Sequence, residues 1–257
     1  MTAATAEKRH PHKTRIRFDD QWTIRTKSDH DCLFVALQIR NRFGPWVRLL
    51  VASQNMGGKF DEADLGRILD HKPDVVALQE GGDQGWVERF AKRRGYRMIP
   101  DTGRAGQAST PLLIAEEVEI KKAWWVLLLG AVRIGKGSGP DVSKPKWYDR
   151  NRLVLAGVRF GASSIHLTVS QQFAARLRAA LVEVSIIDEQ FDAVGYPMLA
   201  IGDSNSASGQ PLRKAMLRKG WTTNAEQLGE LDTMENRDID IVATQARLCA
   251  PPVRHAA

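Results

Sequence analysis

The chain has 257 residues, 43% of them hydrophobic and 26% charged, which is ordinary for a globular protein and fits one large α/β domain or two small ones. Its net charge of +7 favours a polyanionic partner, above all nucleic acid, although a generic basic surface would give the same value. The two cysteines lack CxxC spacing, so a zinc cluster is not expected. The first thirty residues are polar and the longest apolar run has six residues (124–129), so neither a secretion signal nor a membrane span is expected. The sequence therefore predicts a cytoplasmic soluble protein.

Residues 1–46 are predicted to form a basic N-terminal extension to one domain that spans residues 47–257. Basic and histidine residues concentrate at positions 8–13. Within the extension, the runs 21–25 and 33–37 predict either a strand and a short helix or a β-hairpin.

The first half of the domain alternates strand-like runs with helices. A strand over 48–54 ends at Asn55, and a helix over 61–71 follows, with Asp61 as its N-cap. A second apolar strand, 73–78, stops at Gln79-Glu80. The next elements are a helix over about 84–94 and a strand over 96–99.

The second half contains several strands that follow each other with no room for a helix between them. The strand candidates are 111–115, 118–129, 153–159, 163–167, 197–203 and 238–242. A loop rich in glycine and basic residues is expected over 130–152, and helices over 173–191 and 211–219. This mixture does not fit a doubly wound parallel sheet. It predicts an α/β (α+β) sandwich of four-layer type, in which two packed mixed or antiparallel β-sheets are flanked by helices.

Several of these strands end in polar residues that suit phosphate chemistry. The runs ending at Glu80 and Asp203 each deliver a carboxylate at the tip of a buried strand, so both can point into one cleft. Carboxylates placed in this way can hold a divalent cation and a phosphate without a local metal-binding loop. A third run ends at His166, and a fourth brings Asp240 near the C-terminus; Asp238, two residues earlier, would face the same side of that strand.

These strand ends resemble the signatures of the endonuclease/exonuclease/phosphatase superfamily, which has the deoxyribonuclease-I-like fold. Five signatures occur in the family's order over residues 47–244. They are a strand ending in Asn55, Asp74–Glu80, a strand ending in His166, Gly202–Asn205, and Ile239–Ile241.

The resemblance implies a phosphodiesterase that depends on magnesium, with manganese as an alternative, and most simply a nuclease that hydrolyses DNA or RNA by in-line attack of water. Glu80 would be the main metal ligand, and Asn55 would help to position the metal or its water. Magnesium prefers hard oxygen ligands and polarises a phosphoryl oxygen, which agrees with this assignment.

The same resemblance implies the catalytic groups. Asp203 and Asn205 would orient the attacking water and the phosphate. His166 would hydrogen-bond a phosphate oxygen or help to protonate the leaving oxygen. Asp240 would support the catalytic histidine or the metal side of the cleft.

The family's last signature, a Ser-Asp-His triplet before a final strand, is predicted to be missing, because the chain ends in Ala250–Ala257 without it. His255 is then the candidate for the missing histidine. The absence also keeps open an impaired member of the family that binds nucleic acid or a protein partner.

Arg150 and Arg152, in the basic loop beside Trp147 and Tyr148, are predicted to contact the substrate phosphate. A phosphatase acting on a small phosphate ester is the remaining alternative. The sequence leaves DNA against RNA and the oligomeric state open.

Overall fold

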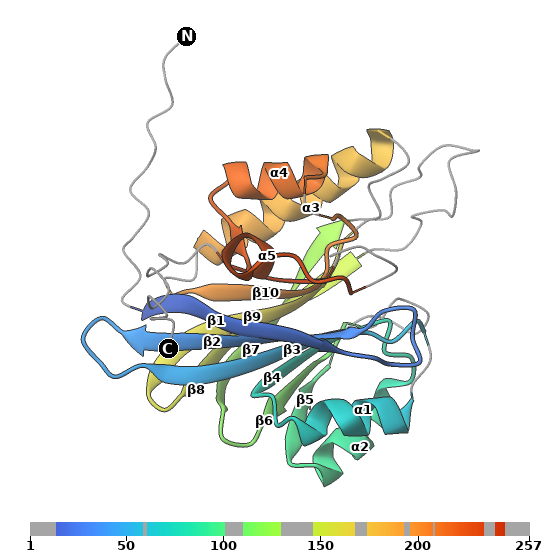
Figure 1. The fold of residues 1–257 in the computed structure, drawn as a ribbon, viewed down its shortest axis with the longest axis vertical. Coiled ribbons are helices and arrows are strands. Elements are labelled where there is room, and N and C mark those ends of the chain that lie inside the picture. The colour runs from blue at the N-terminus through green and yellow to red at the C-terminus, as the bar shows by residue number, and fades with distance from the viewer. Residues whose placement is uncertain are drawn as a thin grey trace, which may run out of the picture.

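The computed structural model describes residues 14–58, 61–100, 110–129, 146–167, 174–192, 196–207, 209–233 and 240–244. Two six-stranded sheets face each other, and helices lie on the outer side of each sheet (Figure 1). This arrangement confirms the predicted sandwich of two mixed sheets flanked by helices.

The first sheet has the order β1-β2-β3-β4-β6-β5. Its strands are β1 (Thr14–Ile24), β2 (Cys32–Asn41), β3 (Val47–Asn55), β4 (Val75–Gln79), β5 (Tyr96–Ile99) and β6 (Leu112–Ala115). The pair β3·β4 is parallel, whereas the other neighbours are antiparallel.

The second sheet has the order β11-β12-β10-β9-β8-β7. Its strands are β7 (Glu119–Leu129), β8 (Lys146–Leu155), β9 (Val158–His166), β10 (Met198–Asp203), β11 (Thr222–Thr223) and β12 (Asp240–Thr244). Here the pair β9·β10 is parallel. In both sheets, therefore, a parallel pair near the middle brings two strand ends to the same edge.

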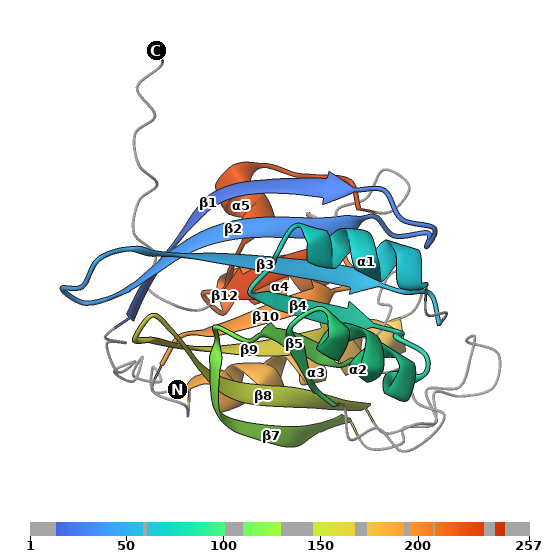
Figure 2. The same ribbon diagram turned by 90° about the horizontal axis from the view of Figure 1, so that it is seen from below.

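Helices α1 (Glu62–Asp70) and α2 (Gln84–Arg93) cover the first sheet, and α3 (Ala174–Asp192) and α4 (Pro211–Arg218) cover the second, as the two views show (Figures 1 and 2). The short helix α5 (Asn224–Leu228) lies against β1. Asp61 caps α1 through a hydrogen bond from the Asp64 amide, as expected.

One apolar core fills the space between the two sheets. A second core lies between the strands β9, β10 and β12 of the second sheet and the helices α3 and α4. Among the described residues, no helix has the length and apolar character needed to cross a membrane.

The described part of the N-terminal segment belongs to the domain, so the predicted boundary at Val47 is wrong. Strands β1 and β2 form an antiparallel hairpin, which was one of the two alternatives for this segment, and β2 pairs with β3. Leu33, Val35 and Leu37 of β2 are fully buried in the central core. An extension would leave these side chains in water, so the hairpin is part of what stabilises the sandwich.

Two predictions in the middle of the chain also need correction. Residues 146–152, expected to be part of a loop over 130–152, belong to β8, whereas residues 130–145 lie outside the described part of the chain. The single strand expected over 153–159 is instead the end of β8, a turn at Ala156-Gly157 and the start of β9. The turn needs positive φ at both residues (47° and 79°), and a glycine at the second position accepts this without strain.

The described ends of β1 and β12 lie at the same end of the sandwich. The hydroxyl of Thr14 donates to the Arg159 carbonyl (3.0 Å), and the hydroxyl of Thr244 donates to the Met198 carbonyl (2.9 Å). Met198 is the register partner of Gly161, two residues from Arg159. The fold would therefore tolerate a different order of elements, in which β12 leads directly into β1.

Candidate active site

The polar strand ends identified in the sequence meet at one edge of the sandwich. Asn55 ends β3, next to the end of β4 at Gln79, and His166 ends β9, next to Asp203 at the end of β10. Asp240, the first residue of β12, is the register partner of Asp203. The sheets face each other, so these ends converge from both.

Asp203 lies at the centre of this cluster and is almost fully buried. Its Oδ2 accepts a hydrogen bond from Asn55 Nδ2 (3.1 Å) and lies 3.8 Å from His166 Nε2, while its Oδ1 accepts from the Asn205 amide (2.6 Å). Asn205 in turn donates from Nδ2 to the Leu167 carbonyl (2.8 Å). Both oxygens of Asp203 are thus held in fixed positions.

The glycine before Asp203 has a steric reason. Gly202 has a φ of 148°, and a Cβ at this position would lie 2.0 Å from the Ile165 carbonyl oxygen of the neighbouring strand. Any larger residue would push β10 away from β9 and would move the Asp203 carboxylate with it.

Glu80 occupies a left-handed turn directly after β4, with a φ of 51°. Its Oε1 lies 3.6 Å from His166 Nε2, and its side chain is 36% exposed, so the carboxylate reaches the surface of the cluster. Asn205 has a φ of 50°, a conformation that asparagine tolerates better than most residues. Positive φ at two candidate site residues fits backbone strain held at a functional site.

The cluster also contains a residue that the sequence analysis missed, His30. Its Nδ1 lies 2.9 Å from Oδ2 of Asp240, and its Nε2 lies 3.9 Å from Oδ2 of Asp203. His30 is buried, with 4% of its surface exposed. It follows β1 in the hairpin loop, so the N-terminal segment supplies a histidine to the centre of the site.

The prediction that a Ser-Asp-His triplet is missing is therefore wrong. Ser28-Asp29-His30 is such a triplet, and the strand β2 follows it at once. Ser28 Oγ donates to the Asn55 carbonyl (2.7 Å), which ties the triplet to the end of β3. Relative to the order of signatures in the family that the sequence resembles, the triplet and the strand after it stand before the first signature, as a circular permutation would place them. The triplet thus stands near the N-terminal end of the described chain, whereas the family's order predicts it after Asp240.

The protonation of the site follows from its burial and charges. Burial alone would lower the pKa of His30, but the hydrogen bond to Asp240 and the charges of Asp240, Asp203 and Asp29 outweigh it and raise the pKa to about 9. Burial and the charge of Asp240 raise the pKa of Asp203 to about 7, against the opposing effects of His30, the Asn205 amide and Asn55. At neutral pH, His30 is therefore a cation, and Asp203 titrates near the pH at which it would accept a proton.

The structure does not bring all the predicted residues to this cluster. Arg152 lies on β8, and its guanidinium stacks 5.2 Å from the Tyr196 ring centroid and 5.8 Å from that of Trp124. The side chain of Arg150 and the residues Asp238 and His255 lie outside what the structure describes. Of the two aspartates weighed for the last strand, Asp240 is the one seen in the cluster.

The donors present fit a divalent cation of the magnesium type. The Glu80 carboxylate, directly after β4, and the Asn55 amide oxygen, at the end of β3, are hard donors at the ends of neighbouring parallel strands. Within the described ranges, no group of three or more His, Cys, Asp or Glu residues is arranged to hold a metal by itself. An ion here would thus be bound by one or two protein oxygens plus water and phosphate, which is how magnesium is usually bound.

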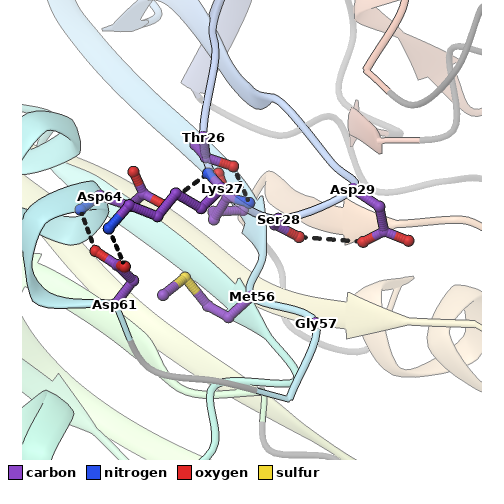
Figure 3. Close-up of a pocket in the computed structure, with 9 residues that line it drawn as sticks. Thr26, Lys27, Ser28, Asp29, Met56, Gly57, Asp61 and Asp64 are labelled. Atoms are coloured by element: carbon purple, nitrogen blue, oxygen red, sulfur yellow. Dashed lines mark hydrogen bonds and ion pairs between the residues drawn. The ribbon is translucent and has the colours of Figure 1, made fainter.

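A pocket of about 420 Å³ lies beside the triplet. Figure 3 shows Met56 and Gly57 at its base, with Lys27, Asp61 and Asp64 gathered on one side and Asp29 on the other. The Lys27 ammonium pairs with Asp61 (2.7 Å), and the Lys27 amide donates to Asp64 (2.7 Å). These contacts fix the chain just before Ser28 and so help to position His30.

Comparisons with known proteins show a likeness of fold. No protein-family model matches the chain, and no curated protein matches its sequence. A solved endonuclease/exonuclease/phosphatase family protein from Bacteroides thetaiotaomicron matches with a TM-score of 0.57 and 15% identity, over 71% of this chain and 72% of that chain. TDP2 from D. rerio, complexed with a single-strand DNA product, matches with a TM-score of 0.57 and 15% identity, over 79% and 86%. A mannosyl-6-phosphatase from Bacteroides thetaiotaomicron matches with a TM-score of 0.56 and 15% identity, over 71% and 75%.

Proposed function

Since the chain has the endonuclease/exonuclease/phosphatase fold, we propose that it is a metal-dependent phosphodiesterase, and specifically a nuclease that hydrolyses DNA or RNA by attack of water in line with the leaving oxygen. The observation that carries the proposal is the buried pair His30–Asp240 beside Asp203. This pair supplies the histidine of the Ser-Asp-His triplet. The expected lack of that histidine was the reason to consider a catalytically impaired family member. The net charge of +7 supports a polyanionic substrate.

In this proposal Asp203 accepts a proton from the attacking water. Its raised pKa makes it a better base than an exposed aspartate, and its hydrogen bonds from Asn55 and the Asn205 amide hold it in place. Once the water has lost its proton to Asp203, the negative charge grows on the phosphate oxygens.

Two histidines can stabilise the negative charge that develops on the phosphate oxygens. His30 is held by Asp240 as an imidazolium, with Nε2 directed to the same side as Asp203, so it can donate to a phosphate oxygen. His166, between Glu80 and Asp203, can donate to another phosphate oxygen or to the leaving oxygen. A divalent ion bound through Glu80 and Asn55 would supply Lewis-acid stabilisation of the same phosphate.

A phosphatase acting on a small ester is the second candidate. It is favoured by the pocket beside the triplet, which is lined by Asp29, Asp61 and Asp64 and suits an uncharged, hydroxyl-rich group better than a second phosphate. A nuclease would instead need an open basic path along the polymer.

The experiment that tests the proposal incubates the purified protein with plasmid, single-stranded DNA, RNA and a chromogenic phosphate ester, with magnesium or manganese and with EDTA. The nuclease proposal expects cleavage of at least one nucleic acid that EDTA abolishes. Cleavage of the ester alone would favour the phosphatase. Absence of hydrolysis on all four substrates would contradict both.

A further inference from the structure

A second feature of the described surface lies at the other end of the first sheet, away from the candidate active site. The β2–β3 turn projects from the end of the sheet opposite to the arrowhead of β3, whose last residue is Asn55 (Figure 1). His30 precedes β2 and Arg40 is near its end, so the two are separated by about 30 Å along the strand at ~3.3 Å per residue.

Five arginines gather on the outer face at this end, which we call the arginine face. They are Arg15, Arg17, Arg40, Arg42 and Arg48. Strand register explains the gathering: Arg15 lies opposite Arg40, and Gln38 lies opposite both Arg17 and Arg48. Alternate residues of β1 and β2, such as Ile16 and Ile39, point into the core, so Arg15, Arg17 and Arg40 on these strands point outward. Arg42, after β2, and Arg48, on β3, are exposed.

Aromatic rings hold this face in shape. The guanidinium carbons of Arg17 and Arg40 lie 4.5 Å and 4.3 Å from the centroid of the same Trp46 ring. Arg42 lies 5.0 Å from the centroid of Phe43, whose side chain is 87% exposed. Stacking fixes the guanidinium planes without using an N–H donor. Arg17 Nη2 donates to Gln38 Oε1, so at Arg17 only part of the guanidinium is left to bind a ligand.

The positive charge of this face is only partly balanced. In the described residues, none of the five arginines forms an ion pair with a carboxylate. The Nε atoms of Arg17 and Arg40 are buried without a hydrogen-bond partner, so a ligand would meet the outer Nη groups. Two carboxylates are close. Asp19 accepts from Gln38 (3.3 Å), and Asp74 is near enough to Arg48 for the arginine to lower its pKa, although burial raises that pKa overall.

We propose that the arginine face binds the backbone of a single-stranded nucleic acid. All five cations are arginines, whose planar N–H groups match phosphate oxygens in pairs. The exposed Phe43 ring beside Arg42 offers a surface on which an unpaired base can stack, and such a stack is typical of proteins that bind single strands. A strand bound here would have to cross about 30 Å to reach His30, so the face would hold long substrates and leave short ones unaffected.

The test measures binding apart from hydrolysis. A labelled oligothymidylate of about twenty nucleotides is titrated with protein in EDTA, in a Glu80→Gln background, over a series of salt concentrations. The variant Arg42→Ala/Phe43→Ala/Arg48→Ala removes two charges and one ring from exposed positions, so it should fold normally. The matched control, Lys214→Ala/Leu217→Ala/Arg218→Ala, removes two charges and one exposed apolar side chain from α4 on the opposite layer.

The proposal expects the arginine-face variant to bind about tenfold or more weakly, and the slope of log K against log salt to fall by about 1.4, since each phosphate contact contributes about 0.7 for a single strand. The control should bind like the parent. Hydrolysis of the chromogenic ester by the same triple variant with intact Glu80 should be unchanged.

Equal losses in both variants, or no loss in either, would overturn the proposal. So would a triple variant that binds the oligonucleotide normally but loses binding to vesicles of anionic lipid, because the face would then fit a membrane. If the triple variant fails to fold, Arg42→Glu alone gives the same test. A protein that hydrolyses nothing but binds through this face would refute the proposed function and leave this inference standing.

Discussion

Nδ1 of His30 lies 2.9 Å from Oδ2 of Asp240, although 210 residues separate the two along the chain. Asp240 is itself the register partner of Asp203 across β10 and β12. The pair thus links the N-terminal hairpin to the last described strand, and it directs the imidazole at the carboxylate that we propose as the base. Without β1 and β2, the cluster would have Asp203 and Asp240 buried side by side with no cation between them.

Replacing Asp240 with asparagine should lower the pKa of His30 from about 9, because burial would then be opposed only by the charges of Asp203 and Asp29. An imidazole titration followed by NMR measures this directly. A His30 pKa that stays near 9 in Asp240→Asn would show that Asp240 is not the group that holds the proton.

Stability without metal should fall as the pH rises above neutrality. A histidine whose pKa is raised in the folded state binds its proton more tightly there, so its contribution is complete below about pH 6.5 and is lost as the pH rises through about 9. The raised pKa of Asp203 acts in the same direction between about pH 4 and 7. The free energy of unfolding, measured with urea in EDTA, should decrease by up to about 3 kcal/mol between pH 6.5 and 9, because a shift of one pKa unit corresponds to about 1.36 kcal/mol. His30→Gln should flatten that slope, and an equal slope in this variant would exclude His30 as its cause.

Glu80→Gln should abolish metal-dependent hydrolysis while leaving the melting temperature nearly unchanged. The change removes a formal charge from the proposed magnesium site at almost constant shape. Activity is measured at low millimolar magnesium, and Glu88→Gln, an exposed position on α2, is the matched control. Wild-type turnover in Glu80→Gln would show that Glu80 is not a metal ligand.

Most of the fold and the strand-end residues could be predicted because each signal is local. An apolar run that ends in Asn55, Glu80, His166 or Asp203 can be recognised as a buried strand from its own sequence, without knowing which strands lie beside it in the sheet. The position of β1 and β2 could not be read in this way, since a hairpin shows its partner strand only through long-range pairing. Ser28-Asp29-His30 was present in the sequence, but its meaning depends on a permuted order. For Arg152 the sequence shows a basic position near aromatic residues, but it does not show that the guanidinium stacks on Tyr196.

The permutation makes a prediction of its own. A chain opened in the β2–β3 turn, between Gly44 and Pro45, with the original ends joined by residues 245–257 and 1–13, should fold and keep its activity, because the described ends of β12 and β1 lie at the same end of the sandwich. By contrast, deletion of residues 1–46 should give an unfolded or aggregated protein, since it removes fully buried side chains of β2. Circular dichroism and gel filtration distinguish the two. A folded, active deletion variant would restore the view of this segment as an extension.

The most direct test of the account is the turnover of His30→Ala on the nucleic acid that the wild-type protein cleaves. It should be compared with His71→Ala, which removes an exposed histidine outside the site, and with a chain shortened by Arg254–Ala257, which removes His255. We predict a loss of about 10²–10⁴-fold for His30→Ala, the range for a group that acts in proton transfer or charge stabilisation, and wild-type turnover for the other two. Wild-type turnover in His30→Ala, or a comparable loss in the shortened chain, would contradict the assignment of His30 as the catalytic histidine.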